Sequence, residues 1–176
     1  MKRIVSIQDI SCFGKCSLTV ALPIISAMGI EACCIPTAVL STHTGGFTGY
    51  TYRDLTSDIP NIAAHWNSIN LNLDAVYTGY LGSFKQIKIV SDFFDTFKTD
   101  DNLLIVDPVM GDKGKFYAGF NEAFALEMKN LCKKADVILP NLTEAALLLG
   151  EEYVESGYDE EFIKNMLIRL SEIGSK

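Results

Sequence analysis

The stretch NLLIVDPVMGD, from Asn102 to Asp112, joins the pattern of a buried strand to a polar exit. Its Leu-Leu-Ile-Val run is continuously apolar, which is typical of a strand that a parallel sheet buries on both faces. Asp107 and Pro108 end the run, and Asp-Pro is common in turns. The stretch therefore predicts a core strand of an α/β protein, with carboxylates at Asp107 and Asp112 beyond the end of the strand.

Apolar runs rich in β-branched residues alternate with amphipathic runs on both sides of this stretch. Strands are expected over residues 3–8, 31–40 and 136–141, and in the first part of 74–81 and of 102–112, each of which then leaves the sheet through a turn. Helices are expected over residues 18–29, 58–71, 84–97, 121–134, 143–150 and 159–173. This alternation predicts βαβ units around a mostly parallel sheet in one domain over residues 1–176, with Pro36 at an edge or a bulge of the second strand.

Composition limits the classes of partner. The chain of 176 residues has a formal net charge of −7, which argues against nucleic acid and anionic membranes as partners. No apolar run approaches the ~18 residues of a membrane span, and the start, MKRIVSIQDIS, lacks the pattern of a signal peptide. Five cysteines, an odd number without a secretory signal, favour reduced thiols and a cytoplasmic location.

Polar residues follow each of the five expected strands. In open parallel sheets, ligands bind in the crevice beyond the carboxyl ends of the strands, so these residues are candidates for a site. They are Asp9, the loop 41–46, Tyr80, Asp107 with Asp112, and Asn141 with Glu144. Two carboxylates five residues apart on a loop suit Mg²⁺, which takes one or two carboxylates together with water and phosphate oxygens.

Several candidates also have a purely structural interpretation. Asp107 and Asp112 could simply belong to turns. Asn141 and Glu144, three residues apart at a helix start, could serve only as caps. GKCS at residues 14–17 is not a P-loop, because the first glycine that the motif requires is absent. The residue types alone therefore leave both interpretations open.

Five segments together resemble the pyridoxal/pyridoxamine kinases of the ribokinase-like superfamily. The segments are IQDISCFGKCS, VLSTHTGGFTGY, YTGYLGS, VDPVMGDKGKFY and ILPNLTEA. They stand in the order and spacing of that family, from residue 2 to about residue 173. The resemblance implies a three-layer α/β/α fold with a mostly parallel central sheet. It also implies an enzyme that uses Mg·ATP to phosphorylate the 5′-hydroxymethyl group of pyridoxal, pyridoxamine or pyridoxine.

The resemblance assigns part of the candidate set to a vitamin pocket. His43, Thr44 and Gly45 would border the pyridine ring, and Tyr80 would pack on it or donate a hydrogen bond near it. Asp9 stands where these kinases commonly hold a serine that contacts the ring. A carboxylate there could pair with a protonated ring nitrogen or an amine, which would favour pyridoxamine.

The resemblance assigns the remaining candidates to the nucleotide. Asp107, Asn141 and Glu144 would bind the ATP phosphates, and Asp112 with Glu144 would hold Mg²⁺. Homodimers are usual in the family, so a homodimer is the expected assembly of the complete protein.

One segment of the family has no counterpart in the sequence. The GxGD segment, which supplies the anion hole and the catalytic base, is unmatched. We therefore expect the chain to be the N-terminal portion of a kinase, truncated before the catalytic base and inactive alone. Two alternatives stay open: a hydroxymethylpyrimidine (phosphate) kinase, which shares the DPV and PN-E segments, and a non-catalytic vitamer-binding protein that lacks the nucleotide half.

Overall fold

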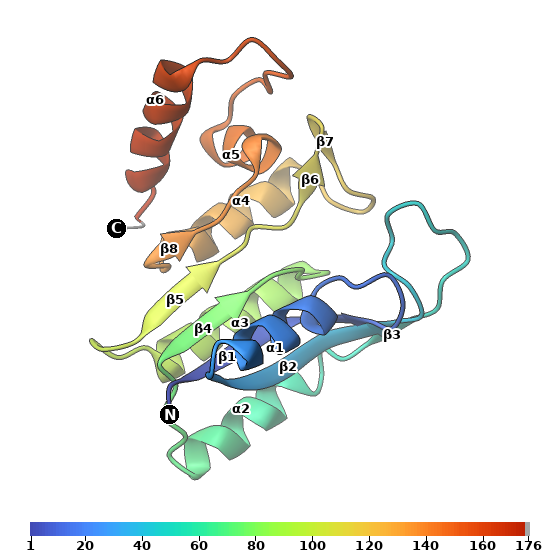
Figure 1. Ribbon diagram of the computed structural model, residues 1–176, viewed down its shortest axis with the longest axis vertical. Helices are drawn as coiled ribbons and strands as arrows, with labels where there is room; N and C mark the ends of the chain where they lie inside the picture. The colour runs from blue at the N-terminus through green and yellow to red at the C-terminus, as the bar shows by residue number, and fades with distance from the viewer. Residues whose placement is uncertain (175–176) are drawn as a thin grey trace.

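The computed structural model describes residues 1–174, and a six-stranded sheet lies at its centre (Figure 1). The strands are β1 (Arg3–Ser11), β2 (Glu31–Leu40), β3 (Tyr52–Asp54), β4 (Ala75–Thr78), β5 (Leu103–Val106) and β8 (Val137–Ile138). Their order across the sheet is β3-β2-β1-β4-β5-β8. All neighbouring strands are parallel except β2 and β3. The mostly parallel sheet expected from the alternation is therefore confirmed.

Helices cover the sheet on both faces, as a three-layer fold requires (Figure 1). The helix α1 (Leu18–Ala27) packs over β1 and β2 on one face. The other face carries α2 (Ile59–Ser68), α3 (Phe84–Phe97) and α4 (Glu122–Cys132). The chain continues through α5 (Leu142–Leu149) and α6 (Glu160–Ser171), which pack on each other. None of the helices within residues 1–174 is long and apolar enough to cross a bilayer.

The main core lies between the sheet and α3, and the sequence of α3 explains why. Ile87, Val90 and Phe94 recur at three- to four-residue intervals, so they share one face of the helix, and all three are buried. They belong to one cluster with alternate residues of the central strands, which are Val5, Ile7, Val76, Leu104 and Val106. Full burial of one such side chain contributes about 1.5–3 kcal/mol.

Three short strands were not expected from the sequence. The strand β3 pairs with the end of β2, and β6 (Gly111–Asp112) and β7 (Lys115–Phe116) form a small hairpin where only a turn was expected. Segments of two or three residues are too short to show the two-residue period of a strand. The bulge expected at Pro36 is confirmed, because the pairing of β1 with β2 shifts in register just after the pair Gln8–Pro36.

Gln86 links three segments beneath the carboxyl ends of the strands. It is fully buried in the first turn of α3. Its Nε2 donates to the Thr37 carbonyl at 3.1 Å and to the Thr56 hydroxyl at 2.8 Å, and its Oε1 accepts from the Gly82 N–H at 2.7 Å. Gln86 therefore holds the loop after β4, which carries Tyr80, against β2.

We expect Gln86→Ala to lower the free energy of unfolding by about 2–3 kcal/mol, because three polar groups lose their partner inside the protein. Urea unfolding measures the difference. Lys85→Ala is the matched control: it removes an exposed side chain in the same helical turn and should change the free energy by no more than about 0.5 kcal/mol. Equal stability of the two variants would contradict the prediction.

Candidate functional site

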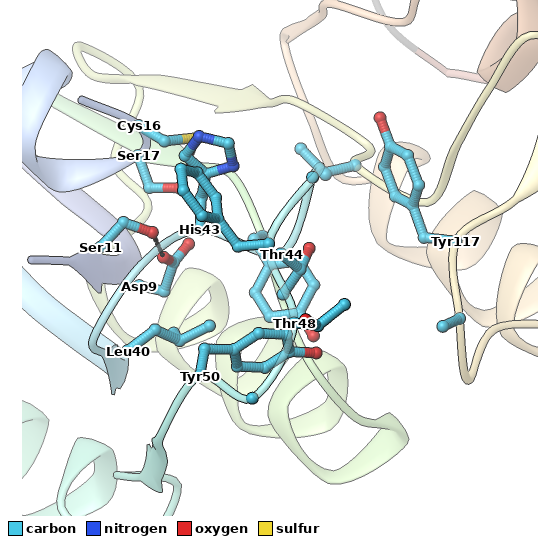
Figure 2. A pocket seen from close by; sticks show the side chains of 16 residues that line it. Asp9, Ser11, Cys16, Ser17, Leu40, His43, Thr44, Thr48, Tyr50 and Tyr117 are labelled. Carbon is cyan, nitrogen blue, oxygen red and sulfur yellow. Dashed lines mark hydrogen bonds between the residues drawn. The ribbon is translucent and has the colours of Figure 1, made fainter. Parts of the chain in front are cut away.

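Five predicted residues line one cavity of about 740 Å³ at the carboxyl ends of the strands (Figure 2). They are Asp9, His43, Thr44, Gly45 and Tyr80. Pockets for small organic ligands measure about 300–1,000 Å³. The volume is therefore suitable for a substituted pyridine, and the fold brings together the whole set that the resemblance assigned to a vitamin pocket. Contact of these residues with a ligand stays a prediction.

Asp9 lies near the end of β1, which extends three residues beyond the predicted strand. Only 5% of the residue is exposed, and its side chain lines the cavity. Its Oδ2 accepts a hydrogen bond from the Ser11 hydroxyl at 3.0 Å (Figure 2). Residues two apart on a strand share one side of it, so Ser11 holds the carboxylate toward the cavity.

His43 is positioned by the loop over residues 12–17. Its backbone N–H donates to the Phe13 carbonyl at 3.3 Å, and its ring meets Phe47 edge-on with centroids 4.9 Å apart. Gly14 lies against the His43 ring with φ +103°, and a Cβ atom there would overlap the ring. Only glycine suits both the positive φ and the close approach. The two loops therefore close one part of the cavity wall together.

Tyr80 follows β4 and contributes another part of the wall. Its backbone carbonyl accepts from the Thr37 hydroxyl at 3.2 Å, and its ring centroid lies 5.8 Å from that of Phe120. Burial, and then the charges of Tyr52 and Asp9, raise the pKa of Tyr80 to about 12. The phenol therefore stays protonated at neutral pH and can donate a hydrogen bond.

Asn141 and Glu144 form a reciprocal cap at the start of α5. The Asn141 Oδ1 accepts from the Glu144 N–H at 2.9 Å, and the Glu144 Oε2 accepts from the Asn141 N–H at 3.0 Å. The other Glu144 oxygen accepts from the Met110 N–H at 3.1 Å, and the Asn141 amide donates to the Gly111 carbonyl at 2.9 Å. The structural interpretation as caps is thus correct, and both side chains also link α5 to the segment that leaves β5.

Two carboxylates in this region, the buried Glu144 and the half-buried Asp107, have raised pKa values. Burial raises the pKa of Glu144 to about 7, against the effect of the backbone N–H groups that it accepts from. Burial raises the pKa of Asp107 to about 6, against a hydrogen bond from Tyr77. Asp107 lines a second cavity of about 590 Å³, which shares Tyr80 and three other residues with the first. Strongly shifted carboxylates beside a cavity are typical of functional sites.

Asp112 lies on β6 and is exposed, with one oxygen accepting from the Lys113 N–H at 2.9 Å. Within residues 1–174, no three acidic, histidine or cysteine side chains are grouped to hold a metal ion. Mg²⁺ needs only one or two carboxylates when waters and phosphate oxygens complete its shell. The donor set therefore fits a magnesium ion that arrives with a nucleotide, and does not fit an all-protein metal cage.

Several cavity residues were not predicted from the sequence. Ser11, Ser17, Tyr50 and Tyr117 also line the cavity (Figure 2). Ser17 has φ +55°, a conformation that is rare outside glycine and carries no sequence signal. Tyr117 reaches the cavity because the β6–β7 hairpin reverses the chain just before it. Tyr50 lies just beyond the candidate loop 41–46, so a candidate range that continued to residue 50 would have included it.

Comparison with known proteins identifies the family and the relatives of the chain. The chain matches the family model described as phosphomethylpyrimidine kinase over residues 21–176. Pyridoxal kinase PdxY of Vibrio vulnificus is 35% identical over 152 residues, covering 82% of this chain and 51% of the relative. PdxY of Actinobacillus pleuropneumoniae is 31% identical, covering 85% of this chain and 54% of the relative. The chain spans about half the length of the curated relatives it matches.

Solved structures give the same result at the level of the fold. A protein of Bacteroides thetaiotaomicron described as a phosphomethylpyrimidine kinase, in a crystal form with pyridoxal, is 48% identical with a TM-score of 0.93. The match covers 99% of this chain and 60% of that one. Pyridoxal kinase of Lactobacillus plantarum is 37% identical with a TM-score of 0.86, covering 97% and 60%.

These matches confirm the ribokinase-like fold and the resemblance to pyridoxal kinases that the five segments indicated. Because the family model covers more than half of the sequence, the chain belongs to the phosphomethylpyrimidine kinase family.

Proposed function

We propose that this protein acts in the transfer of a phosphoryl group from Mg·ATP to the 5′-hydroxymethyl group of pyridoxal, pyridoxamine or pyridoxine. The observation that carries the proposal is the position of a ring-sized cavity beside the sheet edge that carries Asp107, Asp112 and Glu144, which we call the carboxylate edge. The curated relatives are pyridoxal kinases, and the Bacteroides structure was determined with pyridoxal. A cytoplasmic location and a homodimer of the complete protein belong to the same proposal.

The cavity would orient the vitamer. Its wall is mainly aromatic and aliphatic, which suits a flat ring, and hydroxyl groups are spaced around it. Thr44 and the protonated phenol of Tyr80 can donate to a phenolic oxygen. His43 and Gly45 would border the ring from the loop that Gly14 holds in place. The few polar groups would thus set the direction in which the hydroxymethyl arm points.

The carboxylate edge would receive the nucleotide. Mg²⁺ held with its waters by Asp112 would neutralise charge on the phosphates, which is the main requirement of phosphoryl transfer. Both oxygens of Glu144 already accept backbone N–H groups, so Glu144 would act on the metal chiefly through water. Asp107 and the Asn141 amide would lie beside the phosphates. No residue of this chain is assigned as the catalytic base.

Hydroxymethylpyrimidine (phosphate) kinase is the second candidate, because the matching family model carries that description. The two substrates are similar in size and both present a hydroxymethyl arm. They differ in the phenolic oxygen, which only the B6 vitamers have. The hydroxyl groups on the cavity wall favour the vitamer.

Competition between the two ligands tests the proposal. We expect pyridoxal to bind with a Kd at least about 10-fold below that of hydroxymethylpyrimidine, because its phenolic oxygen accepts hydrogen bonds inside the cavity. Titration calorimetry with each ligand, alone and in competition, measures the ratio. Tighter binding of the pyrimidine would overturn the vitamer assignment. Tight pyridoxal binding with no effect of Mg·ATP on the stability of the chain would instead support a non-catalytic vitamer-binding protein.

Asp112→Asn separates the metal site from the vitamin cavity. In the complete protein, we expect kcat to fall by about 10²–10³ at saturating pyridoxal, because charge on the transferred group loses its counterion. The pyridoxal Kd should change by less than about 2-fold, since Asp112 does not line that cavity. Asp100→Asn removes the same charge at an exposed position and is the control. An equal loss of pyridoxal affinity would show that Asp112 acts on the fold.

The raised pKa of Asp107 predicts a pH-dependent stability. Between about pH 4 and 6 the folded chain binds this proton more tightly than the unfolded chain does. The stabilisation is complete at the acidic end and is lost as the pH rises through about 6. We expect Asp107→Asn to be more stable than the parent at about pH 8, by on the order of 1–2 kcal/mol, with a smaller difference near pH 4.

Urea unfolding of parent and Asp107→Asn at several pH values measures this difference. Asp100→Asn serves again as the control, because an exposed carboxylate contributes little to the pH dependence. A stability gain that stays constant across the pH range would assign the effect of Asp107→Asn to packing instead of titration.

A further inference from the structure

The vitamin cavity contains a carboxylate for which the protein supplies no cation. Asp9 is almost fully buried, and within residues 1–174 the one side-chain hydrogen bond to its carboxylate comes from Ser11 to Oδ2. The cavity wall has no lysine or arginine and one imidazole, that of His43, and in the same part of the chain no ion pair includes Asp9. Withdrawing a carboxylate from water is costly unless an opposite charge or several donors compensate. The oxygen that Ser11 leaves free is therefore suited to a cationic donor on the ligand.

The sheet fixes the distance of Asp9 from the carboxylate edge. Ile7 pairs with Thr78, and Thr78 pairs with Val106, so Asp9 is level with the first residues that leave β5. The strand β4 lies between β1 and β5, and neighbouring strands are about 4.8 Å apart, which places Asp9 about 10 Å from that edge. A pyridine ring with its substituents fits between the two.

The chemistry of the vitamers then selects one orientation. In phosphoryl transfer the 5′-hydroxymethyl arm must point to the carboxylate edge. The 4′ substituent is adjacent to that arm on the ring, whereas the ring nitrogen lies two atoms away, on the side opposite the 4′ group. The carbon with the phenolic oxygen also lies two ring atoms from the arm, so the nitrogen and that oxygen flank the edge of the ring that can reach Asp9, whereas the 4′ aldehyde, amine or alcohol lies closer to the arm. Of the two, a carboxylate selects the protonated nitrogen, because it accepts hydrogen bonds and attracts a cation, while the phenolic oxygen accepts from donors such as Tyr80.

We propose that Asp9, positioned by Ser11, accepts a hydrogen bond from the protonated ring nitrogen of the bound B6 vitamer and is a specificity-determining residue. The assignment rests on the proposed function, because that function sets the direction of the hydroxymethyl arm. A carboxylate opposite a pyridinium N–H is a charge-assisted pair, stronger than the neutral hydrogen bond that serine would make. Aspartate is also a usual partner of the pyridinium nitrogen in enzymes that carry a pyridoxal cofactor.

The pairing has a consequence for vitamer choice. Pyridoxal, pyridoxamine and pyridoxine share the ring nitrogen and differ only at the 4′ position. Asp9 therefore raises the affinity for all three, and does not by itself give the preference for pyridoxamine that an amine contact would give. What it selects against is a ring that has no protonated nitrogen at this place.

Nitrogen-15 NMR of ring-labelled pyridoxine bound to the protein tests the proposal. We expect the bound nitrogen to have the chemical shift of a protonated pyridinium in the parent and to move toward the neutral shift in Asp9→Asn. The pyridoxine Kd should rise about 10- to 100-fold in Asp9→Asn, the range for a hydrogen bond to a charged group, and less in Ser11→Ala. Asp100→Asn should leave both readouts unchanged.

A carbocyclic analogue of pyridoxine, with a benzene ring in place of the pyridine, gives the matched ligand control. It should bind parent and Asp9→Asn with equal Kd. An equal loss of affinity for the analogue and for pyridoxine would overturn the pairing and leave Asp9 as a residue that only shapes the cavity. A neutral nitrogen in the parent complex would also overturn it, even if Asp9→Asn did not fold. A parent that binds no vitamer at all would refute the proposed function instead.

Discussion

Parallel pairing of β1 with β4 and of β4 with β5 determines where chemistry can occur in this protein. Parallel strands in register end at the same edge of the sheet, so the residues that follow them meet although they are distant in the sequence. The cavity wall and the carboxylate edge are both products of that one constraint. Gln86 fixes the neighbouring part of the same edge, because its side-chain amide holds the loop after β4 against β2. A shift of one strand by one residue would turn Asp9 from the cavity to the other side of the sheet.

Carboxylates withdrawn from water, two of them buried and Asp107 half-buried, are the second feature that the fold has to accommodate. Glu144 is compensated from within, because it accepts two backbone N–H groups and thereby joins α5 to the exit of β5. Asp107 has a phenol beside it and a raised pKa, and Asp9 has only a hydroxyl. From Glu144 through Asp107 to Asp9, the protein thus supplies progressively fewer groups that compensate the carboxylate. The less the protein compensates a buried charge, the more a ligand cation gains by binding there.

The sequence predicted the sheet, the helices and five residues of the cavity wall, for identifiable physical reasons. Core strands such as β5 have a continuous apolar run, and helices such as α3 have apolar residues at a clear helical period. Both patterns can be recognised without knowledge of the surrounding structure. The sequence did not predict β3, the β6–β7 hairpin or Ser17 in the cavity wall. These depend on two-residue pairings and on a positive φ at a non-glycine residue, which only the surrounding structure can impose. The place of Asp9 after a strand is visible in the sequence. Its lack of a cationic partner is visible only in the folded structure, because the neighbours of Asp9 come from distant segments.

Because the chain has a net charge of −7, the positions of individual charged and polar groups decide which charged ligands it can bind. In the function proposed here, a protein without a general positive field would bind the anionic nucleotide through directed groups: backbone N–H donors, amides such as that of Asn141, and a metal ion that brings its own charge. The same negative field favours a ligand with a cationic ring. A B6 vitamer has a nitrogen that can be protonated at one side and a hydroxymethyl arm toward the other, so its charge can lie toward β1 while its reactive oxygen lies toward Mg²⁺. With β4 between the two positions, the proposed arrangement would hold one cation near β1 and the other near β5 without placing them together.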